Sequence, residues 1–299
     1  MSKYEYYICD VFTQQKFSGN QLAVITDAEG LSDHDMQNIA REFNFSESTF
    51  VFPSEKENTR KVRIFTPRSE VPFAGHPNIG TAFILAETGI FGDFAQSIDV
   101  VFEEKAGNVP IKINKDHCGY IWCELSAPAP LSLGKVATVD LASEVLSIEA
   151  GDINVTTHYP QVASVGLPFL FVELQSLEAL SQAQIDLSKL QRLLQEGFPS
   201  YIHIYCKDVK DFDIRCRMFA PLDGVPEDPA TGSANAALIA LLSHCDQRSD
   251  LEDKWKISQG SEIGRPSVLH GRAQKIGGTV VEVNLGGYSV MVCKGTISI

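Results

Sequence analysis

The sequence of 299 residues lacks the features of several large classes of protein. No apolar run approaches the roughly 20 residues that a membrane-spanning helix needs. The N-terminus begins at once with an alternating strand pattern and has no apolar block of the kind that signal peptides carry. No Gly-x-Gly-x-x-Gly follows a predicted strand, so a Rossmann fold is not expected. These absences predict a soluble, cytoplasmic protein with no membrane partner.

Cysteines and basic residues are also few or unsuitably placed. The seven cysteines are an odd number and include no Cys-x-x-Cys pair, which argues against a disulfide framework and against a zinc site. The formal net charge of −13 argues against nucleic acid as a partner. The cysteines are therefore expected to be reduced thiols. Because metal, nucleotide and flavin signatures are missing, we also expect action without a cofactor or metal.

The chain does contain enough apolar sequence for a full hydrophobic core. Apolar residues make up 44% of it and charged residues 21%, as in ordinary globular proteins. This length suits two domains, and Pro128 and Pro130 mark a linker between them. We predict one domain at 1–126 and another at 127–287. The final strand, 288–299, is expected to rejoin the first domain.

One motif occurs twice in the chain. In each copy an Arg-x-Phe-x-Pro segment leads to a Val-Pro pair and then to a glycine that opens an apolar helix. The first copy runs from Arg63 to Gly75 and the second from Arg217 to Gly232. A helix start beside glycine leaves backbone N–H groups unpaired next to the positive end of the helix dipole. Such a helix start suits a carboxylate or another anion, so a small anionic molecule is the expected partner.

Both motif helices are apolar nearly all round, so each is expected to be buried. We predict that the first ends near Glu87, and that Ser32 and Asp35 together cap a separate, amphipathic helix. The residues from Ser176 to Gly197 are predicted to form one further helix. The fold class is therefore α/β with mixed sheets, in two pseudo-symmetric domains. Each domain is expected to be a β-sheet wrapped around a central helix, and the two helices to face each other across a cleft.

Several stretches across nearly the whole chain resemble those of one known family. They are Asp10-Val-Phe-Thr13 with Gly19-Asn20, Phe45-Ser-Glu-Ser-Thr49, Phe73-Ala-Gly-His-Pro77 with Gly80, Glu227-Asp-Pro-Ala-Thr-Gly-Ser-Ala-Asn235 and Gln259-Gly-Ser-Glu-Ile-Gly-Arg-Pro266. In order and spacing they resemble the PhzF-like proteins of phenazine biosynthesis, which are relatives of diaminopimelate epimerase in fold.

The resemblance implies a homodimer and a specific kind of reaction. For the best-known member of the family this is the cofactor-free isomerisation of a dihydro-hydroxyanthranilate, in which a glutamate moves a proton between two ring carbons. That glutamate corresponds to Glu47. The substrate-binding residues that the resemblance implies are Gly75, His76, Asp228, Gly232 and Ser233, with Asn20 and Ser46 as neighbours.

The chemistry of these residue types fits such a reaction. Burial in a closed cleft disfavours an ionised carboxyl, so we expect the pKa of Glu47 to be raised toward neutral pH. One such group can take a proton from one carbon and return it to another. His76, just inside a helix start, is expected to be neutral because the helix dipole disfavours its cation. On position alone both residues would more often be structural, and Asp228 and Ser233 would be helix N-caps.

Other functions stay open at this point. Racemases and epimerases of the same fold use a pair of cysteines at these helix starts, whereas here the starts read Ala74-Gly-His and Thr231-Gly-Ser, and Cys216 lies upstream. A hydrolase built from Ser233, His76 and Asp228 is disfavoured because Gly-x-Ser-x-Gly is missing. The alternatives that we keep are an anion-binding protein of the same fold that is catalytically inactive or acts on a different substrate, and a racemase or epimerase of small amino acids.

Overall fold

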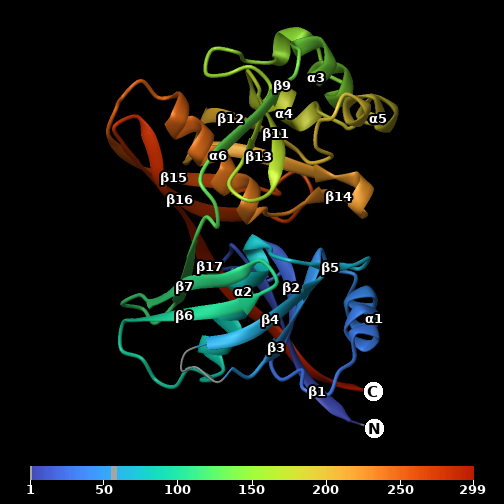
Figure 1. The fold of residues 1–299 in the computed structure, drawn as a ribbon, viewed down its shortest axis with the longest axis vertical. Coiled ribbons are helices and arrows are strands. Elements are labelled where there is room, and N and C mark those ends of the chain that lie inside the picture. Colours follow the sequence, from blue (N-terminus) through green and yellow to red (C-terminus); the bar gives the residue numbers. More distant parts are fainter. Residues whose placement is uncertain (1, 55–58) are drawn as a thin grey trace. The chain divides into compact units, whose positions relative to one another are not determined.

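The computed structural model describes residues 2–54 and 59–299 (Figure 1). Within these ranges the fold is mixed α/β, with 17 strands and 6 α-helices. The chain divides into two compact units, Met1–Ser126 with Gly286–Ile299, and Ala127–Leu285. Across the described ranges, the helices are all too short or too polar to cross a membrane.

The first unit is a ring of strands around helix α2. Its elements are β1 (Lys3–Val11), β2 (Asn20–Ile25), α1 (Asp33–Phe43), β3 (Glu47–Phe52), β4 (Thr59–Phe65), β5 (Glu70–Val71), α2 (Gly75–Glu87), β6 (Ser97–Glu104), β7 (Gly107–Lys115), β8 (Ile121–Ser126) and the end of β17 (Thr279–Ser298). Paired strands run from β1 through β2, β3, β4, β6, β7 and β8 to β17. Strand β17 also pairs with β1, which closes the ring.

Helix α2 lies inside this ring, as its apolar sequence predicts. It packs against β1, β2, β3, β7 and β8, and every residue from Gly75 to Ala86 is buried. Gly80 allows the close approach, because a Cβ atom there would lie 2.6 Å from Leu22 Cδ2 and 2.7 Å from Val11 Cγ2. The predicted end of the helix at Glu87 is confirmed.

The second unit also has a buried helix among strands. Its elements are β9 (Ser132–Val136), α3 (Val139–Leu146), β10 (Gln161–Ser164), β11 (Pro168–Glu173), α4 (Leu177–Gln182), α5 (Leu187–Gln195), β12 (Ile202–Val209), β13 (Phe212–Ala220), β14 (Val225–Asp228), α6 (Gly232–Cys245), β15 (Leu251–Gln259) and β16 (Ser267–Ile276). Strands β11 and β12 are parallel, as are β13 and β15. Helix α6 packs against β10, β11, β15 and β16.

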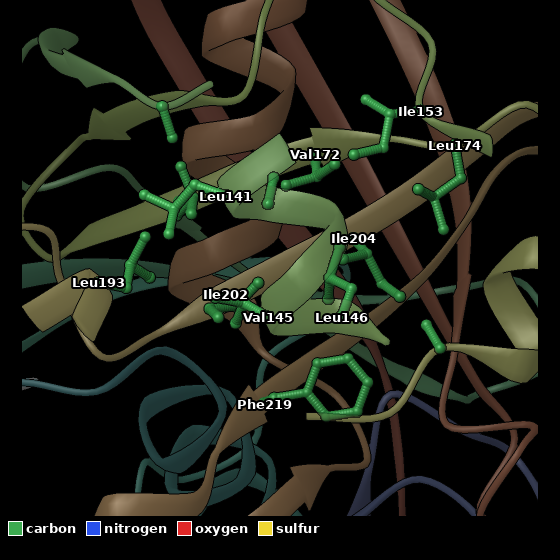
Figure 2. Close-up of a cluster of buried hydrophobic side chains, with 14 of the residues drawn as sticks. Leu141, Val145, Leu146, Ile153, Val172, Leu174, Leu193, Ile202, Ile204 and Phe219 are labelled. Atoms are coloured by element: carbon green, nitrogen blue, oxygen red, sulfur yellow. The ribbon is translucent and has the colours of Figure 1, made fainter. Parts of the chain in front are cut away.

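A separate apolar core in this unit joins helices α3, α4 and α5 to the strands. Figure 2 shows side chains of α3, such as Leu141 and Val145, together with Ile202 and Ile204 of β12. In β12 these residues alternate with His203, whose side chain therefore points to the other side of the sheet. Amphipathic helices thus cover one face of the strands, while the other face is left for α6.

Two predictions about individual elements are wrong. The stretch from Ser176 to Gly197 forms two helices, because Ala183 has an extended ψ of 132° and Asp186 begins a new helix by accepting hydrogen bonds from the N–H groups of Ser188 and Lys189. The final strand, predicted at 288–299, begins earlier, because β17 is one continuous strand from Thr279 to Ser298. In contrast, the capping box of Ser32 and Asp35 is confirmed.

Candidate active site

The two buried helices begin differently from the four helices that cover the surface. In α1, α3, α4 and α5 the side chain of the N-cap residue accepts a hydrogen bond from a backbone N–H group of the first turn. The N-cap residues of α2 and α6 are Ala74 and Thr231, and neither makes a side-chain cap hydrogen bond. The positive ends of α2 and α6 therefore lack the cap that the other helices have.

In the first unit, three of the predicted site residues meet at the start of α2. Asn20 and Glu47 are the first residues of the parallel strands β2 and β3, which places them at the same edge of the sheet. Asn20 Nδ2 lies 3.3 Å from His76 Nδ1, and Glu47 Oε2 lies 3.6 Å from the same nitrogen. Ser46, directly before β3, is half-buried.

His76 is a neutral histidine in this position. Its side chain is buried, and burial lowers its pKa to about 3, although a hydrogen bond with the Gln21 backbone acts in the opposite direction. The contact with Glu47 is therefore not an ion pair at neutral pH. His76 Nε2 is buried and has no hydrogen-bond partner among the described residues. A buried polar atom without a partner is unfavourable unless a ligand or water completes it.

In the second unit, a hydrogen-bonded loop precedes helix α6. Asp228 is buried, and its Oδ2 accepts a hydrogen bond of 2.5 Å from Thr231 Oγ1. Gly232 and Ser233 are the first two residues of the helix, and Ser233 is half-buried. Because the N-cap position belongs to Thr231, the structural role considered for Asp228 and Ser233 as N-caps is not the one observed.

Gln259, the last residue of β15, connects this loop to the helix. Its Oε1 accepts hydrogen bonds from Thr231 N at 3.0 Å and Asn235 Nδ2 at 2.8 Å. Its Nε2 donates to Asp228 O at 2.8 Å and to Thr231 Oγ1 at 3.0 Å. The next residue, Gly260, has a φ of +78°, and a Cβ atom there would lie 2.5 Å from the Pro229 carbonyl oxygen. These contacts fix the position of the loop.

Two other kinds of contact occur in both units, one made by an asparagine of each buried helix and one by each motif arginine. Asn78 Nδ2 donates to the N-cap carbonyl of α2, and Asn235 Nδ2 to that of α6, each at 3.0 Å. Each motif arginine makes two hydrogen bonds to one carboxylate. In the first unit Arg63 binds Glu70, with both distances 2.8 Å, and in the second Arg217 binds Glu227, at 3.0 and 2.8 Å. The sequence repeat therefore corresponds to a repeated local structure.

Asn78, Asn235 and Gln259 were not among the predicted site residues. A signal for the two asparagines was present, since each stands three positions after the glycine that opens its helix. Gln259 carried no such signal because it is remote from the helix in the sequence.

A thiol contacts the start of α6, but as a hydrogen-bond donor. Cys216 is buried, donates a hydrogen bond to Asn235 Oδ1 at 3.4 Å, and has its pKa raised by burial, which keeps it a thiol. Among the residues that the structure describes, no group of three or more His, Cys, Asp or Glu side chains could hold a metal ion.

Comparisons with known proteins show the family of the chain. Residues 9–295 match PhzC-PhzF, the phenazine biosynthesis-like protein family. The chain is 34% identical to an uncharacterised isomerase of Mesorhizobium japonicum, with 100% of both chains covered. It is also 34% identical to the trans-2,3-dihydro-3-hydroxyanthranilate isomerase of Pseudomonas aeruginosa, with 98% of both chains covered.

Solved structures show the same fold. A PhzF-family phenazine biosynthesis protein of Bacillus anthracis has a TM-score of 0.90 at 24% identity, with 100% of both chains covered. A probable proline racemase of Agrobacterium radiobacter has a TM-score of 0.65 at 13% identity, with 99% of this chain and 93% of that chain covered. The fold is thus that of the diaminopimelate epimerase-like enzymes. Within that class the chain belongs to the PhzC-PhzF family and is an isomerase.

Proposed function

We propose that this protein is a cofactor-free isomerase that shifts a proton between two carbons of a small, carboxylate-bearing substrate, with Glu47 as the general acid and base. The observation that carries this proposal is the contact between Glu47 and the neutral, buried His76 at the uncapped start of α2. A neutral neighbour leaves the Glu47 carboxyl free to change its protonation state during a reaction cycle.

The proton shift requires one group with two roles. Ionised Glu47 takes a proton from a substrate carbon, so that a C–H bond breaks, an O–H bond forms and the electron pair moves into the neighbouring π system. The same carboxyl then returns this proton to another carbon, and the double bonds end in new positions. General acid–base catalysis of this kind contributes roughly 10²–10⁴-fold in rate.

The remaining residues bind the substrate in this proposal. The first-turn N–H groups at Gly75 and Gly232, beside N-cap residues that give no side-chain cap, suit a carboxylate. His76 contributes Nε2, which has no partner in the described part of the chain. Asp228 and Ser233 also contact the substrate, with Asn20 and Ser46 as neighbours. We extend the proposal to two pseudo-symmetric domains and a homodimer.

The relatives supply the first substrate to test. Trans-2,3-dihydro-3-hydroxyanthranilate is the substrate that the name of the Pseudomonas aeruginosa relative gives. The purified protein would be incubated with this compound and other cyclic dienes in heavy water, and deuterium at carbon would be followed by NMR. Exchange that needs the protein supports an isomerase. Absence of exchange for every candidate would instead favour an anion-binding protein without turnover.

Glu47→Gln tests the role of the carboxyl. We expect roughly 10³-fold slower isomerisation, because an amide cannot take up the proton, with substrate affinity nearly unchanged. The matched control is Glu42→Gln on helix α1, a glutamate that is exposed to solvent. Loss of affinity together with activity would show that Glu47 anchors the substrate and does not move the proton.

A further inference from the structure

The structural repeat extends upstream of the two motif arginines, and there Tyr201 is the counterpart of Glu47. Glu47 lies 16 residues before Arg63, and Tyr201 lies 16 residues before Arg217. The strand pairing agrees with this spacing. The residue opposite each arginine lies three positions after Glu47 in β3 and three positions after Tyr201 in β12. Tyr201 therefore has, in the second unit, the position that Glu47 has in the first.

The side chain of Tyr201 lies on the inner face of the strands, which is the face left for α6. Ile202 and Ile204 belong to the core that α3, α4 and α5 cover. Because successive side chains of a strand alternate, Tyr201 and His203 point to the other face. The Tyr201 ring centroid lies 5.6 Å from that of Phe169 in β11. Phe169 is fully buried, whereas Tyr201 is half-buried, so part of its ring remains accessible.

The strand pairing also places this face beside the loop that leads into α6. His203 of β12 is opposite Met218 of β13, and Met218 is opposite Asp228 of β14. Side chains that are directly opposite in antiparallel strands share a face, so these three form one row. Tyr201 is the next residue of β12 on the same face. The phenol therefore lies beside the row that ends in Asp228, one of the proposed substrate-binding residues.

His203 gives an independent indication of a ligand on this face. Its side chain is 0% exposed, and neither ring nitrogen has a hydrogen-bond partner among the described residues. Its counterpart in the first unit is Thr49, whose hydroxyl oxygen lies 2.8 Å from that of Thr81 on α2. The sixth residue after the opening glycine is Thr81 in α2 but Leu238 in α6, which cannot form such a contact. Buried polar atoms without a partner are unfavourable unless a ligand or water completes them.

We propose that Tyr201 is a substrate-binding residue at the start of α6, and that it selects a substrate with a flat, unsaturated ring. An aromatic face binds another flat ring by offset or edge-to-face contact, and the phenol hydroxyl can donate one hydrogen bond. A carboxyl at the same position of the first unit, that of Glu47, moves the proton. The repeat thus provides proton transfer in one unit and ring binding in the other. The reaction in this inference rests on the proposed function, whereas the binding of a flat ring does not.

Two simple acids test the selection of a flat ring. Benzoate and cyclohexanecarboxylate each carry one carboxylate on a six-membered ring, but only the ring of benzoate is flat. In NMR titrations the native protein and Tyr201→Phe should bind benzoate roughly 2- to 10-fold more tightly than the saturated acid, and Tyr201→Leu should lose this preference. The matched control is Tyr159→Leu, an exposed tyrosine of the same unit, which should keep the preference. A preference that persists in Tyr201→Leu, or no binding of either acid, overturns the proposal.

The contact can also be observed in the native protein, without a variant that changes the packing. In protein labelled with ¹³C in its tyrosine rings, the signal that is absent from Tyr201→Phe belongs to Tyr201. This signal should shift when benzoate is added, while that of Tyr159 should stay in place. If benzoate binds and the Tyr201 signal does not move, the proposal is overturned.

Steady-state kinetics separate ring binding from proton transfer. The substrate is trans-2,3-dihydro-3-hydroxyanthranilate, as the name of the Pseudomonas aeruginosa relative gives it. Tyr201→Leu should raise KM roughly 2- to 10-fold with a smaller change in kcat, whereas Glu47→Gln should lower kcat. An unchanged KM in Tyr201→Leu would contradict this inference and leave the proposed function intact. If the native protein exchanges no proton, yet its preference for benzoate depends on Tyr201, the proposed function fails and this inference stands.

Discussion

The starts of helices α2 and α6 share a backbone arrangement but differ in the side chain at the end of a neighbouring strand. At α6 the permanent amide of Gln259 makes hydrogen bonds with the loop and with Asn235. At α2 the corresponding residue, Glu104, is an acid whose oxygens have no partner in the described ranges. Glu47 and His76 also lie at the start of α2. The two copies of this repeated structure therefore differ in the hydrogen bonds at the end of the strand beside each helix start.

The two copies also differ in how deeply their arginine–carboxylate pairs are buried. Arg217 and Glu227 are each 9% exposed at the side chain, whereas Arg63 is 19% exposed and Glu70 12%. Glu70 has a second cation, Lys105, while Arg217 also donates to the carbonyl groups of Leu180 and Ala183. If the arginine is lost, Glu70 therefore keeps a second cation, whereas Glu227 loses the cation that binds it.

The largest expected effect on stability is that of Arg217→Met. It leaves Glu227 and two buried carbonyl groups without their donor, which should reduce the free energy of unfolding by about 3–5 kcal/mol. Arg63→Met is the matched variant, and we expect a loss of about 1 kcal/mol because Lys105 still binds Glu70. Urea unfolding would measure both. Equal losses would show that the two pairs are equivalent despite their different burial.

The second prediction concerns the loop that Gln259 holds. Gly260→Ala should lower the free energy of unfolding by about 3 kcal/mol, since the φ of +78° is unfavourable for alanine and the new Cβ would meet two backbone oxygens at 2.5 Å. Gly264→Ala in the same loop has a similar φ of +71° but open space around the Cβ, and should lose only about 1 kcal/mol. The comparison fails if both variants lose the same amount.

A third prediction makes the start of α6 resemble that of α2. Gln259→Glu replaces the N–H donor that faces the Asp228 carbonyl by an oxygen, so the acid must be protonated to keep this hydrogen bond. We expect little loss of stability at pH 5 and a loss of about 1–3 kcal/mol at pH 8. Thermal unfolding between these pH values would measure it. A loss that is the same at every pH would contradict the comparison.

A fourth prediction concerns stability at acid pH. Burial lowers the pKa of both His76 and His203 to about 3. The unfolded chain binds these protons below about pH 6.5, so stability should fall as pH decreases from 6.5 toward 3, by about 2 kcal/mol for each histidine at pH 5.

His203→Phe separates the two histidines. His203 has no partner for either ring nitrogen among the described residues and packs edge-on against Phe171. The variant should therefore lose part of the acid destabilisation, whereas the exposed control His34→Asn should keep all of it. If His203→Phe loses as much stability at acid pH as the native protein does, this histidine is not neutral when buried.

Much of the local structure could be predicted from the sequence. The bounds of α2 follow from Gly75 and the apolar residues after it, and the start of α1 from the pair Ser32 and Asp35. The stretch after Ser176 was predicted wrongly as one helix because a helical pattern does not reveal that Asp186 competes as a new N-cap. Whether a helix continues or a side chain such as Asp186 caps a new one depends on a small difference in free energy between the two structures.

The site could be predicted only in part. Asn20, Glu47 and His76 were selected by resemblance, and the structure shows that they meet. Gln259 was missed as a positioning residue, because it acts on a helix far from it in the sequence. Contacts of this kind depend on which strand ends beside which helix.

By itself, the sequence determined the two apolar helices, the glycine that opens each one and the repeated arginine motif. These are local properties of composition and spacing. Only the tertiary structure decided that Gln259 is fully hydrogen-bonded while Glu104 is buried without a partner. The physical reason is that burial and hydrogen bonding, and with them the charge of an acid, depend on neighbours that the fold brings together.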